Sequence, residues 1–152
     1  MVLELVLAGF FVQGATPLEA ARDRQDRPAL EKFVRETEAA AAKASGDAEA
    51  QYRCAVAASY LAEVDQELRD KKAARQAAEV GIKAAERAVV LKPDNAENYR
   101  VLGTLYGQAI TDLMSGLTYG PRAKDAISKA VSGSTGAGSP TLRTPYPRRK
   151  IT

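Results

Sequence analysis

The chain has 152 residues, of which 45% are hydrophobic, 27% charged and only 6% aromatic, a composition that suits one domain with a modest core. It has no histidine, and Cys54 is its only cysteine, so a histidine-based triad, a histidine-ligated metal or haem and an internal disulfide are excluded. Four of the 22 basic residues and none of the 19 acidic ones lie in 132–152, so the rest of the chain has a net charge of −1 and the basic balance is poor evidence for specific nucleic-acid binding by the fold.

An apolar run from Val2 to Val12 begins the sequence; Glu4 interrupts it, and small residues up to Ala15 follow. The run is too short to span a membrane, but it is typical of the core of a secretory signal cleaved after Ala15. Such a signal would place the mature protein in a bacterial periplasm or outside the cell. No Lys or Arg precedes the run, so the alternative is a short apolar helix over 1–15 that docks on the fold.

The next part of the sequence predicts helices and no strand, so the fold class is all-α. Thr16 is a predicted N-cap with Pro17 in the first turn, and Asp26 is the next cap. Gly81 lies within a helix of mostly small residues, where glycine costs about 1 kcal/mol relative to alanine, so we expect close helix contact there. The expected helices cover about 17–25, 26–44, 48–69 and 73–91.

The segment 96–107 contains an aromatic and glycine pattern, Tyr99-x2-Leu102-Gly103-x2-Tyr106, whose four residues share one helical face. A related segment lies 47 residues earlier, where Tyr52-Arg53 aligns with Tyr99-Arg100. The helices that follow are also alike, because Gly81-x3-Ala85-x2-Ala88-Val89 is similar to Ala123-x3-Ile127-x2-Ala130-Val131. Pro121 is predicted to start the last helix.

These patterns resemble the tetratricopeptide repeat family, as found in bacterial proteins. The resemblance implies a right-handed α-solenoid of antiparallel helix pairs over residues 16–131. The three pairs would cover about 17–44, 48–91 and 95–131. In such a solenoid the first helices of the pairs line an inner groove that binds a peptide or a partner protein.

The resemblance also implies which residues face this groove. Arg53 and Arg100 each follow the equivalent tyrosine, so they are expected side by side, where they would hold a peptide carboxylate. The alternative is that each arginine pairs with a surface acid, Glu49 or Glu97. The predicted partner-binding residues are Arg53, Tyr60, Arg100, Thr104 and Gln108.

Catalysis is the second class of function that we consider. A carboxylate site in a helical protein needs acids directed inward from facing helices, whereas the Asp and Glu residues here alternate with Lys and Arg on outer faces. No nucleophile has an adjacent base, and Cys54 is expected to be a buried apolar residue. The sequence therefore favours a non-catalytic scaffold without cofactor or metal over a small helical enzyme.

The sequence changes character after Val131. Residues 132–152 are rich in Gly, Ser, Pro and Arg and are predicted to be a disordered tail. No helix is predicted there to cover the face formed by Ala123, Ala126, Ile127, Ala130 and Val131. A truncated, even non-functional, repeat array is one explanation, which the abrupt change of composition favours; self-association of this last pair is the other.

Overall fold

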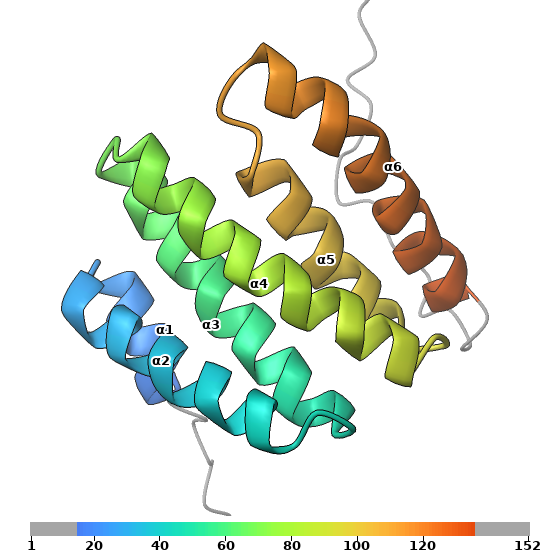
Figure 1. The fold of residues 1–152 in the computed structure, drawn as a ribbon, viewed down its shortest axis with the longest axis horizontal. Coiled ribbons are helices and arrows are strands. Elements are labelled where there is room, and N and C mark those ends of the chain that lie inside the picture. The colour runs from blue at the N-terminus through green and yellow to red at the C-terminus, as the bar shows by residue number, and fades with distance from the viewer. Residues whose placement is uncertain (1–14, 136–152) are drawn as a thin grey trace, which may run out of the picture.

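The computed structural model describes residues 15–135, and these form six α-helices and no strand, so the all-α prediction is confirmed for this part of the chain. Successive helices run in opposite directions, and α4 passes in front of α3 and α5 in Figure 1. The first four match the predicted helices to within two residues. The helices are α1 (Pro17–Asp23), α2 (Arg27–Lys43), α3 (Ala48–Glu67), α4 (Lys71–Leu91), α5 (Ala96–Gln108) and α6 (Leu113–Thr135).

Local hydrogen bonds fix where the first five helices begin. Each follows a polar residue whose side-chain oxygen accepts a hydrogen bond from a backbone N–H of the first turn. Thr16 and Glu19 form a reciprocal capping box at α1. The remaining caps are Asp26, Asp47, Asp70 and Asn95.

Two buried amide side chains repeat the same contact in successive helix pairs. The Gln51 amide of α3 donates to the Ala41 carbonyl near the end of α2 at 2.9 Å. The Asn98 amide of α5 donates to the Ala88 carbonyl near the end of α4 at 3.2 Å. The two donors and the two acceptors are each 47 residues apart, so the period found in the sequence is also present in the hydrogen bonds.

The connections α1–α2 and α3–α4 share one backbone conformation. Gln25 and Arg69 have positive φ angles of 53° and 62°, in the left-handed region. In each connection the N–H of the next residue, Asp26 or Asp70, donates at 2.8 Å to the carbonyl five residues earlier. This hydrogen bond closes the end of the preceding helix, and the aspartate then caps the following one.

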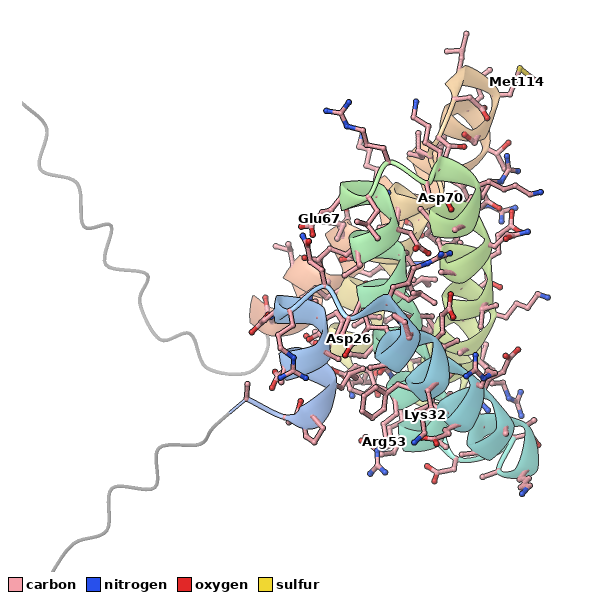
Figure 2. The ribbon with its side chains drawn as sticks, turned by 90° about the vertical axis from the view of Figure 1, so that its left-hand side faces the viewer. Asp26, Lys32, Arg53, Glu67, Asp70 and Met114 are labelled. Atoms are coloured by element: carbon pink, nitrogen blue, oxygen red, sulfur yellow. The ribbon has the colours of Figure 1, made fainter. Side chains whose placement is uncertain are left out.

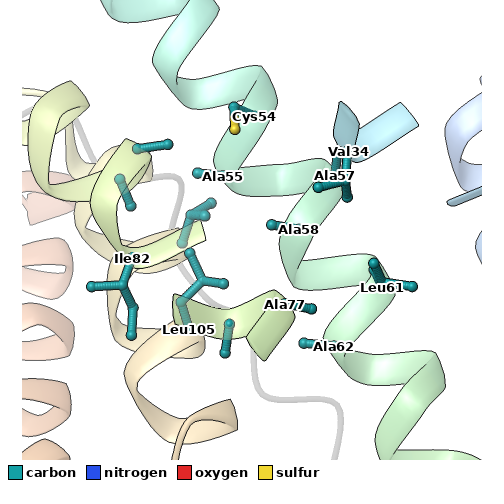
Figure 3. Close-up of a cluster of buried hydrophobic side chains, with 14 of the residues drawn as sticks. Val34, Cys54, Ala55, Ala57, Ala58, Leu61, Ala62, Ala77, Ile82 and Leu105 are labelled. Atoms are coloured by element: carbon teal, nitrogen blue, oxygen red, sulfur yellow. The ribbon is translucent and has the colours of Figure 1, made fainter. Parts of the chain in front are cut away.

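The core is built largely from small side chains of α3 and α4, with Leu105 of α5 inserted between them (Figure 3). Leu105 is fully buried. A Cβ atom on Gly81 would lie 2.5 Å from Leu105 Cδ2 and 3.0 Å from the Cβ of Ala58. The close helix contact expected at Gly81 is therefore present.

The start of α6 differs from the prediction, because Pro121 lies inside this helix rather than at its beginning. Asp112 and Ser115 start the helix earlier. The Ser115 N–H donates to Asp112 Oδ1 at 2.8 Å, and Ser115 Oγ accepts from the Asp112 N–H at 3.0 Å. Tyr119 then stacks on Tyr106 with ring centroids 5.9 Å apart, which joins the early turns of α6 to α5.

The end of α6 also lies beyond the predicted boundary, since residues 132–135 are helical and not part of a tail. Gly133 explains the continuation: its Cα is close enough to α5 that an added Cβ would lie 3.1 Å from the Cβ of Ala96. The segments 1–14 and 136–152, on which the predicted signal and the rest of the predicted tail fall, lie outside the described residues.

The predicted open face of the last pair is present in part. Val131 is 59% exposed, as expected for a face without a covering helix, and Ile127 is 42% exposed although its side chain also contacts Gly103 of α5. Ala126 was expected on this face but is buried in the core, because it lies on the side of α6 that packs on α5. Three more large apolar residues near the start of α6 are exposed: Leu113, Met114 and Leu117.

Candidate functional site

A pocket of about 310 Å³ lies between α3 and α5. Its volume is at the low end of the range for ligand pockets. Helix α1 also contributes to it, through Arg22. The full lining is Arg22, Tyr52, Val56, Ser59, Tyr60, Glu63, Arg100, Val101 and Thr104.

A hydrogen-bond chain crosses from α3 to α5 at one side of the pocket. The Tyr52 hydroxyl donates to Glu97 Oε1 at 3.0 Å, and the Arg100 guanidinium donates to both carboxylate oxygens of Glu97 at 2.6 and 2.7 Å. The hydrogen bond from Arg100 lowers the pKa of Glu97 and raises that of Arg100. Burial, together with Glu97, raises the pKa of Tyr52 to about 12, so Tyr52 remains a neutral donor.

The opposite side of the pocket is held by α1. The Arg22 guanidinium lies over the Tyr60 ring, 4.5 Å from its centroid, in a cation–π contact. Arg22 also pairs with Asp23 at 2.8 Å. Glu63 is the one acid that lines the pocket, beside the two cations Arg22 and Arg100, so its walls carry mixed charge.

Two hydroxyl groups complete the polar lining. Ser59 Oγ donates to Gln108 Oε1 at 3.1 Å, and the Gln108 amide donates back to the Ser59 carbonyl at 3.1 Å. This reciprocal pair joins α3 to α5 and fixes one wall. Thr104 Oγ1 donates to the Arg100 carbonyl at 3.0 Å, which leaves its oxygen able to accept a hydrogen bond from a ligand.

The structure brings together three of the five predicted site residues. Tyr60, Arg100 and Thr104 line the pocket, and Gln108 lies behind it, bonded to Ser59. Arg53 does not line it; its guanidinium pairs with Glu49 at 3.1 Å, and Figure 2 shows it projecting away from the ribbon. Both arginines therefore make the acid pairs considered as the alternative at the sequence level, Arg53 with Glu49 and Arg100 with Glu97.

Sequence reasoning missed Arg22, Tyr52 and Glu63 as pocket residues. Tyr52 was named only as the residue aligned with Tyr99, and this alignment does not indicate the pocket because Tyr99 does not line it. Arg22 reaches the pocket only because α1 packs on α3, a contact between segments with no shared pattern. Glu63 had no distinguishing signal, since it resembles the other surface acids.

Other kinds of site have less support among the described residues. Cys54 is buried as predicted, and burial raises the pKa of its thiol, so it is a poor nucleophile. Within 15–135 no group of three or more Cys, Asp or Glu side chains is placed to hold a metal ion. The described helices include none with the length and apolarity needed to cross a membrane. No family model, no curated protein and no solved structure matches the chain.

Proposed function

We propose that this chain is a non-catalytic binding module, a right-handed solenoid of the tetratricopeptide type that takes a peptide or a segment of a partner protein in its groove. The observation that carries the proposal is the composition of the pocket. It takes side chains from the first helix of every pair: Arg22 from α1, Tyr60 from α3 and Arg100 from α5. A groove lined by the first helices is the expected binding surface of a helical repeat protein.

Contacts that recur from pair to pair support the repeat architecture. At the ends of the first helices, the Gln25 amide donates to Glu67, and the Gln66 amide donates to the Gln108 carbonyl at 3.1 Å. The first contact joins the end of α1 to the end of α3, and the second joins the end of α3 to the end of α5. Together with the repeated Gln51 and Asn98 hydrogen bonds, they support a regular stacking of the helix pairs.

The chemistry of the lining favours an extended peptide with an acidic group. Arg22 and Arg100 supply guanidinium donors, the Tyr60 ring supplies an apolar wall, and Ser59 and Thr104 supply hydroxyls. Guanidinium groups bind carboxylates through paired, charge-assisted hydrogen bonds. Because Arg100 already binds Glu97, a ligand carboxylate would have to share this guanidinium, so we expect modest affinity that falls as salt rises.

The test is fluorescence anisotropy with labelled short peptides that end in acidic residues, compared with the same peptides amidated at the C-terminus. Arg100→Ala should weaken binding about tenfold or more, because a charge-assisted hydrogen bond is lost. Arg53→Ala is the matched control, since Arg53 has a similar ion pair with an acid one turn away but lies outside the pocket.

The two arginine variants separate the possible outcomes. Weakening by Arg100→Ala alone supports the pocket between α3 and α5. Equal weakening by both variants would restore the hypothesis of an anion site shared by Arg53 and Arg100. Binding that neither variant changes, or no binding by any peptide, contradicts the proposed site.

A further inference from the structure

The exposed side of α6 carries a regular stripe. Its positions follow one another at alternating steps of four and three residues, which is the spacing of a coiled-coil seam. Four of the six are large apolar residues, and the two central ones are a glycine and a lysine. The stripe consists of Leu113, Leu117, Gly120, Lys124, Ile127 and Val131.

The apolar residues of the stripe are exposed, whereas the aligned residues in the middle of α4, from Ala78 to Ala85, are buried. Leu113 is 81% and Leu117 67% exposed. On α4, the residue aligned with Ile127 is Ala85, which is buried under the neighbouring helices. Helix α6 is the last in the row, and no other described helix lies beyond it (Figure 1). Ile127 also contacts Gly103 of α5, and Val131 borders the hollow between α5 and α6, but the outer side of the stripe has no described helix packed on it.

We propose that this stripe pairs with the same stripe of a second copy, with the two α6 helices antiparallel. The spacing is palindromic, so antiparallel helices would bring Leu113 opposite Val131 of the second copy, and Leu117 opposite its Ile127. At the centre, the stem of Lys124 would lie over Gly120 of the second copy, where the missing side chain leaves room. The ammonium group then reaches water at the edge of the seam.

The distribution of exposed apolar residues favours this symmetric pairing over head-to-tail stacking. Within residues 15–135, five of the eight exposed large apolar residues lie on α6, and none lies on α1 or α2. A head-to-tail contact would place the α6 stripe against an end of the row that offers it no exposed apolar partner among the described helices. Two α6 stripes would bury each other's apolar residues, and the resulting twofold dimer leaves no further stripe exposed for a third copy.

The orientation follows from the two central residues. In a parallel pair, Gly120 would face its own copy and leave a gap, and Lys124 would face its own copy with like charge. The antiparallel arrangement avoids both, because it pairs the smallest residue with the longest. A lysine at one such position is a known means of fixing register.

Sedimentation velocity of the full chain over a range of concentrations is the first test. We expect a monomer–dimer equilibrium whose dissociation constant rises at least about a hundredfold in Leu117→Glu, because the change affects both copies. Val90→Glu is the matched control: Val90 is 69% exposed on α4 and off the stripe, so its substitution should leave the constant unchanged. A chain that stays monomeric, or that forms ever larger oligomers with concentration, overturns the proposal.

Gly120→Leu tests the centre of the stripe, and urea unfolding of the monomeric variant measures whether a leucine next to Pro121 is tolerated in α6. An added Cβ at Gly120 meets no atom within 4 Å, and the same is true of Gly107 on α5. Gly120→Leu should abolish dimerisation because its side chain takes the space of Lys124 of the second copy. Gly107→Leu should not change it. A dimer that persists in Gly120→Leu contradicts this seam.

Disulfide trapping tests the orientation, in a Cys54→Ala background with oxidised glutathione as oxidant. The double variant Leu117→Cys and Ile127→Cys should form a covalent dimer through two bonds between position 117 of one copy and position 127 of the other. Each single variant should stay monomeric under denaturing conditions. A covalent dimer from Leu117→Cys alone would indicate parallel helices and overturn the antiparallel seam.

Discussion

At the centre of the molecule and in its last helix pair, a large apolar side chain packs against a glycine of a neighbouring helix, but the side chain is buried to different extents. At the centre, Gly81 of α4 receives Leu105 of α5, which is fully buried. In the last pair, Gly103 of α5 receives Ile127 of α6, whose Cδ1 would lie 2.6 Å from a Cβ at that glycine but which is 42% exposed. The close approach is alike, whereas the enclosure is not. Enclosure by a third helix therefore decides how much such a contact contributes to stability.

The largest difference should come from shortening the two inserted side chains. Leu105→Ala leaves a cavity that is enclosed on all sides, so it should lower the free energy of unfolding by about 2–5 kcal/mol. Ile127→Ala removes a half-exposed group and should cost about 1 kcal/mol. Urea unfolding at concentrations where the chain is monomeric measures both. Equal costs would mean that α6 is covered in solution even in the monomer.

The ion pairs that connect successive helix pairs offer the next comparison. Arg27 pairs at 2.7 Å with Asp65, which is 1% exposed, whereas Arg75 pairs at 3.8 Å with Asp112 and both of these side chains are exposed. Arg27→Ala leaves a buried carboxylate unpaired and should cost about 3 kcal/mol. Arg75→Ala should cost less than about 1 kcal/mol. Thermal unfolding of the two variants checks the ratio, and similar losses would contradict it.

Adding one methyl group to each glycine gives a smaller contrast. In Gly81→Ala the new Cβ meets enclosed atoms of Leu105 and Ala58, so we expect a loss of about 1–3 kcal/mol. In Gly103→Ala the clash is with the end of Ile127, which can turn toward solvent, so the gain in helix propensity of about 1 kcal/mol offsets most of the strain. If Gly103→Ala is as harmful as Gly81→Ala, then Ile127 is held as firmly as Leu105.

Most of the helices could be predicted because their starting signals are local. Asp26, Asp47 and Asp70 cap the helices that follow them, and this chemistry is visible within a few residues of sequence. The start of α6 was wrong because two local signals compete there. A proline typical of a first turn was preferred to the capping pair Asp112 and Ser115, which determines the start.

Only those pocket residues that the repeat alignment places on the groove side of a helix could be predicted. The repeat alignment placed Tyr60, Arg100 and Thr104 on the groove side of their helices. The same alignment put Arg53 beside Arg100, but Arg53 pairs with Glu49 outside the pocket, whereas Arg100 lines it. Arg22 depends on how α1 packs against α3, and no spacing in the sequence encodes that contact.

The smallest predicted effect concerns two carboxylates that respond to pH in opposite directions. Burial raises the pKa of Asp65 although Arg27 opposes it, whereas Arg100 lowers the pKa of Glu97. Folded Asp65 holds its proton to higher pH than the unfolded chain does. Its contribution to stability is therefore greatest below about pH 4 and is lost as pH rises through the raised pKa. Glu97 contributes above its unfolded pKa, and that contribution is lost as pH falls through its lowered folded pKa.

Urea midpoints measured across the acid range in Asp65→Asn and Glu97→Gln test these signs. Relative to the unmodified chain, Asp65→Asn should be least favourable at low pH and improve as pH rises, because it removes a group whose ionisation is penalised by burial. Glu97→Gln should be least favourable near neutral pH and approach the unmodified chain in acid. The Arg27 guanidinium is partly exposed and also lies 3.9 Å from Asp70, so it is not left as a buried, unpaired charge when Asp65 loses its charge. If the stability differences of both variants change with pH in the same direction, then the attraction of Arg27 lowers the pKa of Asp65 more than burial raises it. The Arg27–Asp65 pair would then respond to pH in the same way as the Glu97–Arg100 pair at the pocket.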